Sequence, residues 1–259
     1  MEKITSVKNP AVRALRDLKD RRTRVETGRI LVEGEVMIRE ALKCGLTPCD
    51  LLAEERFADF AAEMAGHGAR CFEVPRSLLE AVCETKSPQG VCASFTAPQP
   101  RSVGALGGAV VALDGVQDPG NLGTMIRTGE GAGITGVIMN NQTVDIFNPK
   151  TIRATMGSIF RVPFVYVPDL ALVLEQMHAK GIYTYAAHLK GQESYDSFSF
   201  REPTAFLIGN EGNGLSKEIS DQAGQYLKIP MEGRVESLNA SIAAALLMYE
   251  AHRQRSARL

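Results

Sequence analysis

Short apolar runs alternate with helical patterns along most of the chain. The run Ala109–Leu113 is apolar at every position, which is typical of a strand buried on both faces of a sheet. Strands that alternate with helices in this way predict a mostly parallel sheet with helices on both faces. Further strands are expected at residues 136–139, 163–167, 183–187, 204–209 and 225–230, and helices at 121–132, 151–158, 171–180 and from about 239 onward.

The first part of the chain shows the same alternation in a smaller unit. Prolines and glycines between Thr96 and Gly108, which interrupt helices and strands, indicate a linker after this unit. We therefore predict an α/β protein with a small N-terminal α/β domain at residues 1–97, a linker at 98–108 and a second domain at 109–259. In the first domain, strands are expected at 30–32, 50–53, 71–74 and 89–95, and helices at 10–22, 36–42 and 76–82, with one more ending near 66.

Composition and cysteine usage restrict the class of protein. An apolar share of 44% is enough for a packed core in a chain of 259 residues. No apolar run approaches the length of a membrane span, and the N-terminus lacks the apolar stretch of a secretion signal. The five cysteines form no C-x-x-C pair, and the four histidines form no ligand cluster. We expect reduced thiols, a cytoplasmic protein and no metal.

Basic residues gather at the start of a chain whose net charge is only −1. Residues 1–29 hold nine bases and four acids, which is a local excess of five. Such a segment is suited to contact the phosphates of a nucleic acid. A solvated helix face explains the same pattern at least equally well.

The glycines of Gly129–Gly133 do not form a dinucleotide-binding loop. Such a loop follows a strand and opens a helix, so that a phosphate meets the helix N-terminus. Here the glycines close a helix and precede a strand, which is the pattern of a helix stop. The P-loop pattern is absent as well, and an NAD-dependent enzyme is therefore disfavoured.

The turn Asp118–Gly123 follows a buried strand and opens a helix, which is where α/β proteins place ligand sites. Arg127 is expected about one turn into that helix, on the side that faces the loop. An arginine near the carboxyl end of a strand suits an anionic ligand or an RNA phosphate. A surface arginine with a solvated head is the alternative.

A denser pattern follows the strand expected at 204–209. Three glycines and two asparagines lie within the loop, and glycine lets a backbone adopt left-handed conformations and approach a ligand closely. Glu211, inside this loop, is expected to be held by backbone N–H groups or by an arginine. An elaborate turn before a helix near Ser216 is the alternative, and the density of special residues favours a site.

The segment before the last helix offers two more polar side chains. Ser237 and Asn239 can each cap the helix or hold a ligand, and one of them is expected to be only a cap. Alanines at positions 240, 243, 244 and 245 keep one face of the helix slim. That face permits close packing against the sheet or a second subunit.

Together these segments resemble the three motifs of the SpoU (TrmH) family of RNA 2′-O-ribose methyltransferases. They occur in family order within residues 109–250. Residues 30–42 also resemble the RNA-binding domain that precedes some members, which is similar to the kink-turn-binding ribosomal proteins. The motifs are Asn121-x-Gly123-x-x-x-Arg127, then Gly209-Asn210-Glu211-Gly212-x-Gly214-Leu215, then Ile229-Pro230-Met231 with Ser237-Leu238-Asn239-x-Ser241.

The resemblance implies S-adenosylmethionine as the methyl donor, a deep trefoil knot in the second domain, and a homodimer with sites near the subunit interface. Real knots are otherwise almost absent from proteins. The final helix is the candidate for the dimer contact. By motif position, the cofactor-binding residues are Gly209, Ile229 and Leu238, with Met231 and Ala187 close by.

The resemblance also implies catalytic roles. Arg127 matches the catalytic arginine of the family, Asn121 would orient it or the ribose, and Glu211 would buttress the site. Ser237 and Asn239 would hold the target nucleotide. A guanidinium is a poor base, so Arg127 can take the hydroxyl proton only if an RNA phosphate or Glu211 shifts its protonation equilibrium. In the alternative, which we favour, Arg127 stabilises the developing alkoxide.

The implied substrate is RNA, with 23S ribosomal RNA favoured over transfer RNA. Family members that act on transfer RNA often carry only short extensions, whereas this chain has an N-terminal domain. A non-catalytic RNA-binding protein of the same fold is opposed by the intact Arg127, Glu211 and Asn239. A base methyltransferase of a related knotted family is opposed by the segment 237–239.

Overall fold

The computed structural model describes residues 1–188, 190–235 and 237–256. The contacts between residues divide the chain into two compact units. Unit 1 comprises Met1–Gln99 and Phe147–Phe160, and unit 2 comprises Pro100–Ile146 and Arg161–Leu259. Each unit has its own sheet and its own hydrophobic core.

Unit 1 is built on five strands, β1 (Glu2–Lys3), β2 (Arg29–Glu33), β3 (Pro48–Ala53), β4 (Arg70–Glu73) and β5 (Val91–Thr96). Its helices are α1 (Pro10–Asp17), α2 (Arg21–Thr27), α3 (Glu35–Lys43), α4 (Ala58–Gly66), α5 (Arg76–Val82) and α7 (Pro149–Thr155), with 3₁₀ turns η1 (Glu55–Phe57) and η3 (Ser158–Phe160). The strand order is β1-β4-β3-β5-β2. β5 is antiparallel to both of its neighbours and the other pairings are parallel, so the sheet is mixed.

The helix predicted over residues 10–22 is two helices, so that prediction is wrong in its extent. α1 stops early, and α2 begins anew after Asp20, whose side chain caps it. The buried Arg24 explains the break, because its guanidinium donates to the carbonyls of Leu18 and Lys19, both at 2.7 Å. Carbonyls at the end of a helix have no partner within that helix, and this arginine supplies one.

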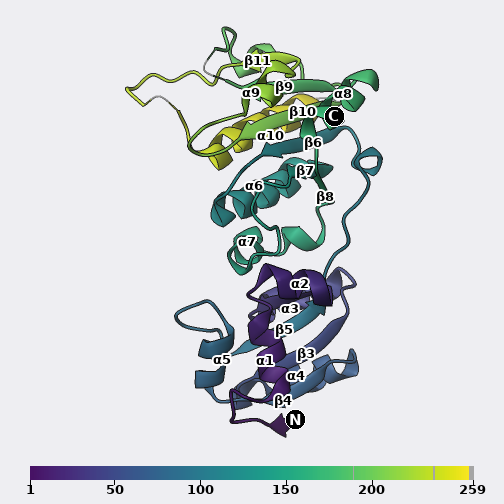
Figure 1. Ribbon diagram of the computed structural model, residues 1–259, viewed down its shortest axis with the longest axis vertical. Coiled ribbons are helices and arrows are strands. Elements are labelled where there is room, and N and C mark those ends of the chain that lie inside the picture. Colours follow the sequence, from purple (N-terminus) through teal and green to yellow (C-terminus); the bar gives the residue numbers. More distant parts are fainter. Residues whose placement is uncertain (189, 236, 257–259) are drawn as a thin grey trace. The chain divides into compact units, whose positions relative to one another are not determined.

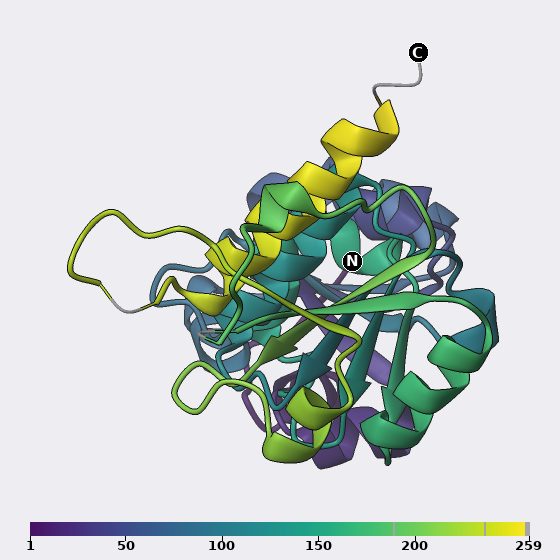
Figure 2. The same cartoon turned by 90° about the horizontal axis from the view of Figure 1, so that it is seen from above.

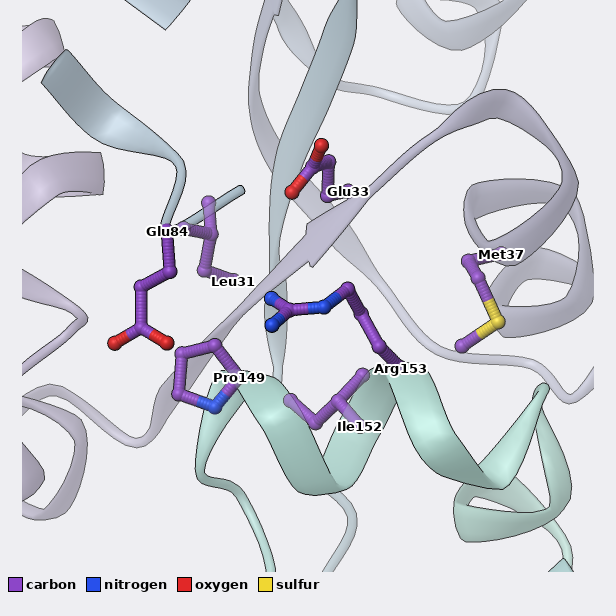
Figure 3. A pocket seen from close by; sticks show the side chains of 7 residues that line it. All are labelled: Leu31, Glu33, Met37, Glu84, Pro149, Ile152 and Arg153. Atoms are coloured by element: carbon purple, nitrogen blue, oxygen red, sulfur yellow. The ribbon is translucent and has the colours of Figure 1, made fainter. Parts of the chain in front are cut away.

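In unit 1, α7 lies against β2 although it comes much later in the chain. A small pocket opens beside the contact, and Figure 3 shows Arg153 extending into it from α7. Two carboxylates, Glu33 and Glu84, border the same pocket. Glu33 is buried and accepts hydrogen bonds from the Thr85 hydroxyl at 2.6 Å and the Gln89 backbone N–H at 3.3 Å. These bonds attach the loop before β5 to the end of β2.

Unit 2 contains six strands, β6 (Ala109–Asp114), β7 (Gly136–Asn140), β8 (Phe164–Val167), β9 (Tyr183–Ala187), β10 (Thr204–Gly209) and β11 (Gln225–Leu227). Its helices are α6 (Pro119–Ala132), α8 (Leu170–Ala179), α9 (Lys217–Asp221) and α10 (Ala240–Ser256), with 3₁₀ turns η2 (Val103–Ala105) and η4 (Tyr195–Ser197). The strand order is β11-β9-β10-β6-β7-β8, and every pairing is parallel.

Helices cover both faces of the unit 2 sheet. α6 and α10 pack together on one face, and α8 and α9 lie on the other (Figures 1 and 2). The face under α8 is lined by small and branched side chains of the central strands, including Val110, Ala112 and Leu207. The α/β class with a mostly parallel sheet and helices on both faces is therefore confirmed. Within the described parts of the chain, no helix is long and apolar enough to cross a membrane.

Candidate active site

Three segments meet at the carboxyl edge of the unit 2 sheet. Parallel strands place all their carboxyl ends at one edge, where α/β proteins hold their ligands. The register pairs Gly209 at the end of β10 with Asp114 at the end of β6, so the loops that follow these strands leave the sheet side by side. The segment before α10 joins them through Asn239.

Glu211, in the loop after β10, is held at the start of α6 by three hydrogen bonds. Its Oε1 accepts from the backbone N–H of Asp118 and from Asn121 Nδ2, both at 3.0 Å. Its Oε2 accepts from the backbone N–H of Gln117 at 3.0 Å. A negative charge is favourable at this position, because unpaired N–H groups point outward from the start of a helix.

These contacts determine the charge state of Glu211. Burial is the largest single influence and would raise the pKa of the carboxyl, but the hydrogen bonds from Asn121, Gln117 and Asp118 together outweigh it. The pKa of Glu211 therefore lies below its ordinary value of 4.5, and the side chain is ionised at neutral pH.

Asn239 connects the start of α10 to the start of α6. Its Nδ2 donates to Asn121 Oδ1 at 2.9 Å, while its Oδ1 accepts from the backbone N–H and the hydroxyl of Ser241 at 2.8 and 2.7 Å. Of the two polar residues before α10, Asn239 is therefore the one that caps the helix. Asn239 caps the helix and binds α6 with the same side chain, because an amide has both a donor and an acceptor. Glu211, Asn121 and Asn239 form a continuous series that joins all three motifs.

Arg127 and Ser237 are exposed and do not join this series. Neither side chain makes a hydrogen bond or an ion pair with any residue that the structure describes. Arg127 is the ninth residue of α6, about two turns into the helix rather than one, because the helix begins at Pro119 and not near residue 121. An exposed guanidinium without internal contacts can bind an anionic group of RNA and lose none of the protein's own bonds.

Gly209 ends β10 at a point where the chain folds back on itself. A Cβ on Gly209 would lie 2.1 Å from both the carbonyl carbon of Gly214 and the nitrogen of Leu215. Because both atoms belong to the backbone, no side chain can be accommodated there. The tight return places backbone groups, rather than side chains, at the carboxyl end of β10.

The five candidate cofactor-binding residues are all half-buried. Ala187 and Gly209 end β9 and β10. Ile229, Met231 and Leu238 belong to the long loop between β11 and α10 in Figure 1. Residues 229–235 and 237–238 of that loop form no helix or strand, and their backbone groups make no hydrogen bond with any described residue.

The chemical groups of this loop are of the types that S-adenosylmethionine requires. Half-buried apolar side chains suit the adenine ring, and open backbone N–H and C=O groups suit the polar atoms of a nucleoside and an amino acid. Among the described residues, no group of three His, Cys, Asp or Glu side chains is placed to hold a metal ion.

The basic residues at the start of the chain serve partly to hold unit 1 together. Lys19 Nζ donates to the carbonyls of Ala81 and Cys83 at 3.0 and 3.1 Å, and Arg24 is buried. Arg22 on α2 is 84% exposed and pairs with a neighbouring glutamate. The positive surface open to phosphates is therefore smaller than the local charge excess indicates.

Comparison with known proteins identifies the class as RNA methyltransferases. Residues 108–249 match the SpoU rRNA Methylase family, and residues 9–93 match the MRM3-like substrate binding domain. The chain belongs to the SpoU rRNA methylase family.

Relatives and solved structures agree along almost the whole chain. The 23S rRNA (guanosine(2553)-2′-O)-methyltransferase RlmP of Bacillus subtilis is 35% identical over 96% of this chain and 98% of its own. The AdoMet-bound rRNA methyltransferase of Sinorhizobium meliloti is 34% identical, with a TM-score of 0.84 and 97% of both chains covered. The SpoU methyltransferase AviRb of Streptomyces viridochromogenes, in complex with AdoMet, is 29% identical, with a TM-score of 0.86 and 96% and 99% covered.

The predicted family, the predicted ribose methylation of RNA and the predicted methyl donor are confirmed by these matches. The sequence did not predict that Gln117 and Asp118 donate hydrogen bonds to Glu211. Both act through their backbone N–H groups, and a backbone donor has no residue-type signature in a sequence. The position of these residues between a buried strand and a helix start is the one available signal.

Proposed function

We propose that this protein transfers a methyl group from S-adenosylmethionine to a ribose 2′-oxygen of 23S ribosomal RNA. The observation that carries the proposal is the hydrogen-bonded series of Glu211, Asn121 and Asn239, which fixes the starts of α6 and α10 against one loop. The name of the Bacillus subtilis relative supports the choice of 23S ribosomal RNA. A cytoplasmic location follows from that substrate.

We infer that Ala187, Gly209, Ile229, Met231 and Leu238 hold the cofactor, with the open backbone groups of the loop before α10 binding its polar atoms. When bound, S-adenosylmethionine supplies a methyl group that is activated by a positively charged sulfur. The chain's own residues must then orient the ribose, exclude competing water and assist the loss of the hydroxyl proton.

In the proposed site, Arg127 stabilises the ribose 2′-oxygen as that oxygen loses its proton. A guanidinium stays protonated at neutral pH, so the hydroxyl proton passes to solvent water, while Arg127 lowers the cost of negative charge on the oxygen that attacks the methyl carbon. Asn121, fixed between Glu211 and Asn239, orients the ribose or the arginine. Ser237, which is exposed, and Asn239 hold the target nucleotide.

We infer that residues 1–97 form the substrate-binding domain, residues 98–108 the linker, and residues 109–259 the methyltransferase domain. The match of residues 9–93 to a substrate binding domain supports the first assignment. Arg21 and Arg22, at the start of α2, are suited to contact RNA phosphates, because both are exposed at the helix surface.

We infer that unit 2 contains a trefoil knot. The chain after β9 closely wraps the end of β11, where the N–H of His188 donates to the carbonyl of Leu227 at 3.0 Å and Ser194 forms a parallel bridge with Lys228. A Cβ on Gly191 would lie 2.6 Å from the carbonyl carbon of Leu227. Such tight passage of one segment past another is a requirement of a knot, and the family relationship supports it.

We infer that α10 forms the interface of a homodimer. Ile242 and Tyr249 on this helix are 48% and 50% exposed, which is unusual for large side chains with so much apolar surface. They border a pocket together with Ala245 and Leu246. The Ile242→Arg variant should elute as a monomer in size-exclusion chromatography under conditions where the wild type elutes as a dimer. A wild type that elutes as a monomer at all concentrations contradicts the interface.

The decisive experiment measures transfer of labelled methyl groups to 23S ribosomal RNA and to transfer RNA, with Arg127→Ala alongside. We expect label in 23S ribosomal RNA at one alkali-resistant linkage, and none with the variant. Label in transfer RNA instead would establish a transfer RNA ribose methyltransferase. RNA binding without binding of S-adenosylmethionine would establish a non-catalytic RNA-binding protein.

A further inference from the structure

A second polar cluster lies behind the candidate active site and includes none of its predicted residues. Its centre is Asp114, the last residue of β6, which is 5% exposed. Asp114 Oδ1 accepts a hydrogen bond from Asn140 Nδ2 at 2.7 Å, and Oδ2 accepts one from the backbone N–H of Ser216 at 2.7 Å. A buried carboxylate is stable only when donors satisfy it, and these two donors come from opposite sides of β6.

Asn140, the last residue of β7, is oriented by its own surroundings. Its Oδ1 accepts from the backbone N–H groups of Gly115 and Thr143 at 3.0 and 3.1 Å. The buried Thr143 hydroxyl lies 3.0 Å from the same oxygen and 3.3 Å from the carbonyl oxygen of Leu113. With donors gathered around Oδ1, the amide must turn its N–H₂ group toward Asp114.

The cluster also fixes the loop that carries Glu211. Asn210 Nδ2 donates to the carbonyl of Gly115 at 2.9 Å, and Asn210 Oδ1 accepts from the N–H groups of Gly212 and Asn213 at 3.0 and 3.1 Å. The loop is therefore attached to the end of β6 at both of its ends, by Asn210 at one and by Ser216 at the other. Glu211 has its direction set by these attachments.

We propose that Asp114 and Asn140 are positioning residues for methyl transfer, which hold the loop after β10 so that Glu211 meets the start of α6. This inference rests on the proposed function. Neither side chain touches the reacting atoms; the pair acts through Glu211, and Glu211 acts through the helix that carries Asn121 and Arg127. A small displacement of that helix separates the catalytic arginine from the ribose oxygen.

The two side chains are complementary in a way that permits an exchange. Asp114 accepts two hydrogen bonds and donates none, whereas Asn140 donates to Asp114 and accepts from Gly115 and Thr143. Asp114→Asn alone leaves an N–H₂ group facing another donor. Asn140→Asp alone brings two carboxylates together in a buried place. In the double variant, Asp114→Asn with Asn140→Asp, every hydrogen-bond donor again faces an acceptor.

The test compares methyl-transfer kinetics of the wild type, both single variants and the double variant on 23S ribosomal RNA. Each single variant should lower kcat by about tenfold or more with KM for RNA nearly unchanged, because misplacement of a catalytic group affects the chemical step. The double variant should recover to within about threefold of the wild type, since its hydrogen bonds are complete. Thr143→Val, which removes one buried hydroxyl, is a milder change and should lower kcat by about twofold to fivefold through the same pair.

Hydrogen exchange of the cofactor-free protein gives a second readout that needs no activity. The N–H groups of Gln117, Asp118 and Ser216 should exchange faster in the single variants and return to wild-type protection in the double variant. Asp50→Asn, which alters an equally buried carboxylate in unit 1, is the matched control. It should lower Tm and leave both kcat and these three N–H groups unchanged.

Single variants that lose Tm but keep wild-type kcat would overturn the proposal, and so would a double variant as impaired as the single ones. If the wild type methylates no RNA, the proposed function fails. The exchange pattern then still decides whether Asp114 and Asn140 hold the loop.

Discussion

Each unit buries one aspartate, and the two aspartates lie at different places on their strands. In unit 1, Asp50 lies within β3, has no exposed surface, and pairs with Arg29 at 3.3 Å and Arg70 at 2.6 Å. In unit 2, Asp114 and Asn140 stand where β6 and β7 end. The carboxyl ends of an all-parallel sheet lie at one edge, so Asp114 and Asn140 are next to the loops of the candidate site. A buried charge within the first sheet serves the fold, whereas one at the edge of the second can serve a reaction.

The largest effect should come from Arg127→Ala at the edge of unit 2. We expect the rate of methyl transfer to fall by about 10²–10³-fold, as is usual when a group that stabilises developing charge is removed. Tm should change little, because the guanidinium makes no hydrogen bond or ion pair with any described residue. Single-turnover kinetics and thermal unfolding measure the two quantities.

Arg201→Ala is the matched control for this variant, since Arg201 is exposed and precedes β10 at the opposite edge of the sheet. Its rate should equal that of the wild type. Equal losses in the two arginine variants would mean that the carboxyl edge has no special role.

Glu211→Gln should have the next largest effect. The amide keeps one acceptor but turns a donor toward the backbone N–H groups of Gln117 or Asp118, so the start of α6 is released. We expect kcat to fall by about tenfold to a hundredfold through misplacement of the catalytic group. Steady-state kinetics with saturating RNA measures it, and a change confined to KM would contradict the assignment.

The hydrogen bonds of Glu211 should also depend on pH in the acid range. Because the pKa of Glu211 is lowered on folding, its contribution is complete above the ordinary value of 4.5 and is lost as pH falls through the still lower pKa of the folded protein. Protection of the Gln117 and Asp118 N–H groups should therefore persist from neutral pH down to that ordinary value. Loss of protection already in the neutral range would contradict an ionised Glu211.

Asp50→Asn in unit 1 should lower stability without lowering the rate of methyl transfer. The loss of a charged acceptor should lower the free energy of unfolding by about 1–3 kcal/mol. Since Arg29 and Arg70 remain 41% and 68% exposed, both can turn to solvent, which limits the loss. Urea unfolding measures the stability, and kcat at a temperature where the variant is folded should match the wild type.

The smallest effect is expected from Arg21→Glu with Arg22→Glu in unit 1. If both residues contact phosphates, RNA affinity should fall by about tenfold and the slope of log affinity against log salt should decrease by about one to two. Arg76→Glu, on the exposed start of α5, is the control. An unchanged affinity and slope would show that this basic surface is only a solvated helix face.

Much of the fold could be predicted from the sequence, because strands buried on both faces carry continuous apolar runs. Ala109–Leu113 lies within β6, and β7 to β10 follow their apolar runs in the same way, whereas β11 ends at Leu227, short of the predicted residue 230. β1 was not predicted, since its residues, Glu2 and Lys3, are polar, exposed and too few to show a period. The break between α1 and α2 depends on where Arg24 points, which no local pattern records.

The site could be predicted as a set of segments but not as a set of contacts. The glycine-rich loop and the cap before α10 stand out by residue type. The partners of Glu211 lie 93 and 94 residues earlier in the chain and act through the backbone, so only the fold brings them together. The same holds for Asp114 and Asn140, each of which reads as an ordinary strand end in sequence.

The contact between Asn121 and Asn239 joins residues 118 positions apart, and it has a consequence for synthesis. β6 is made early and ends up in the middle of its sheet, while α10, which packs on α6, is made late. A nascent chain interrupted between Glu211 and Asn239 carries its arginine on a helix that Glu211 can hold but that α10 has not yet covered. Partial translation products are therefore expected to be inactive, and the order in which the ribosome releases the chain delays catalytic competence until α10 has emerged.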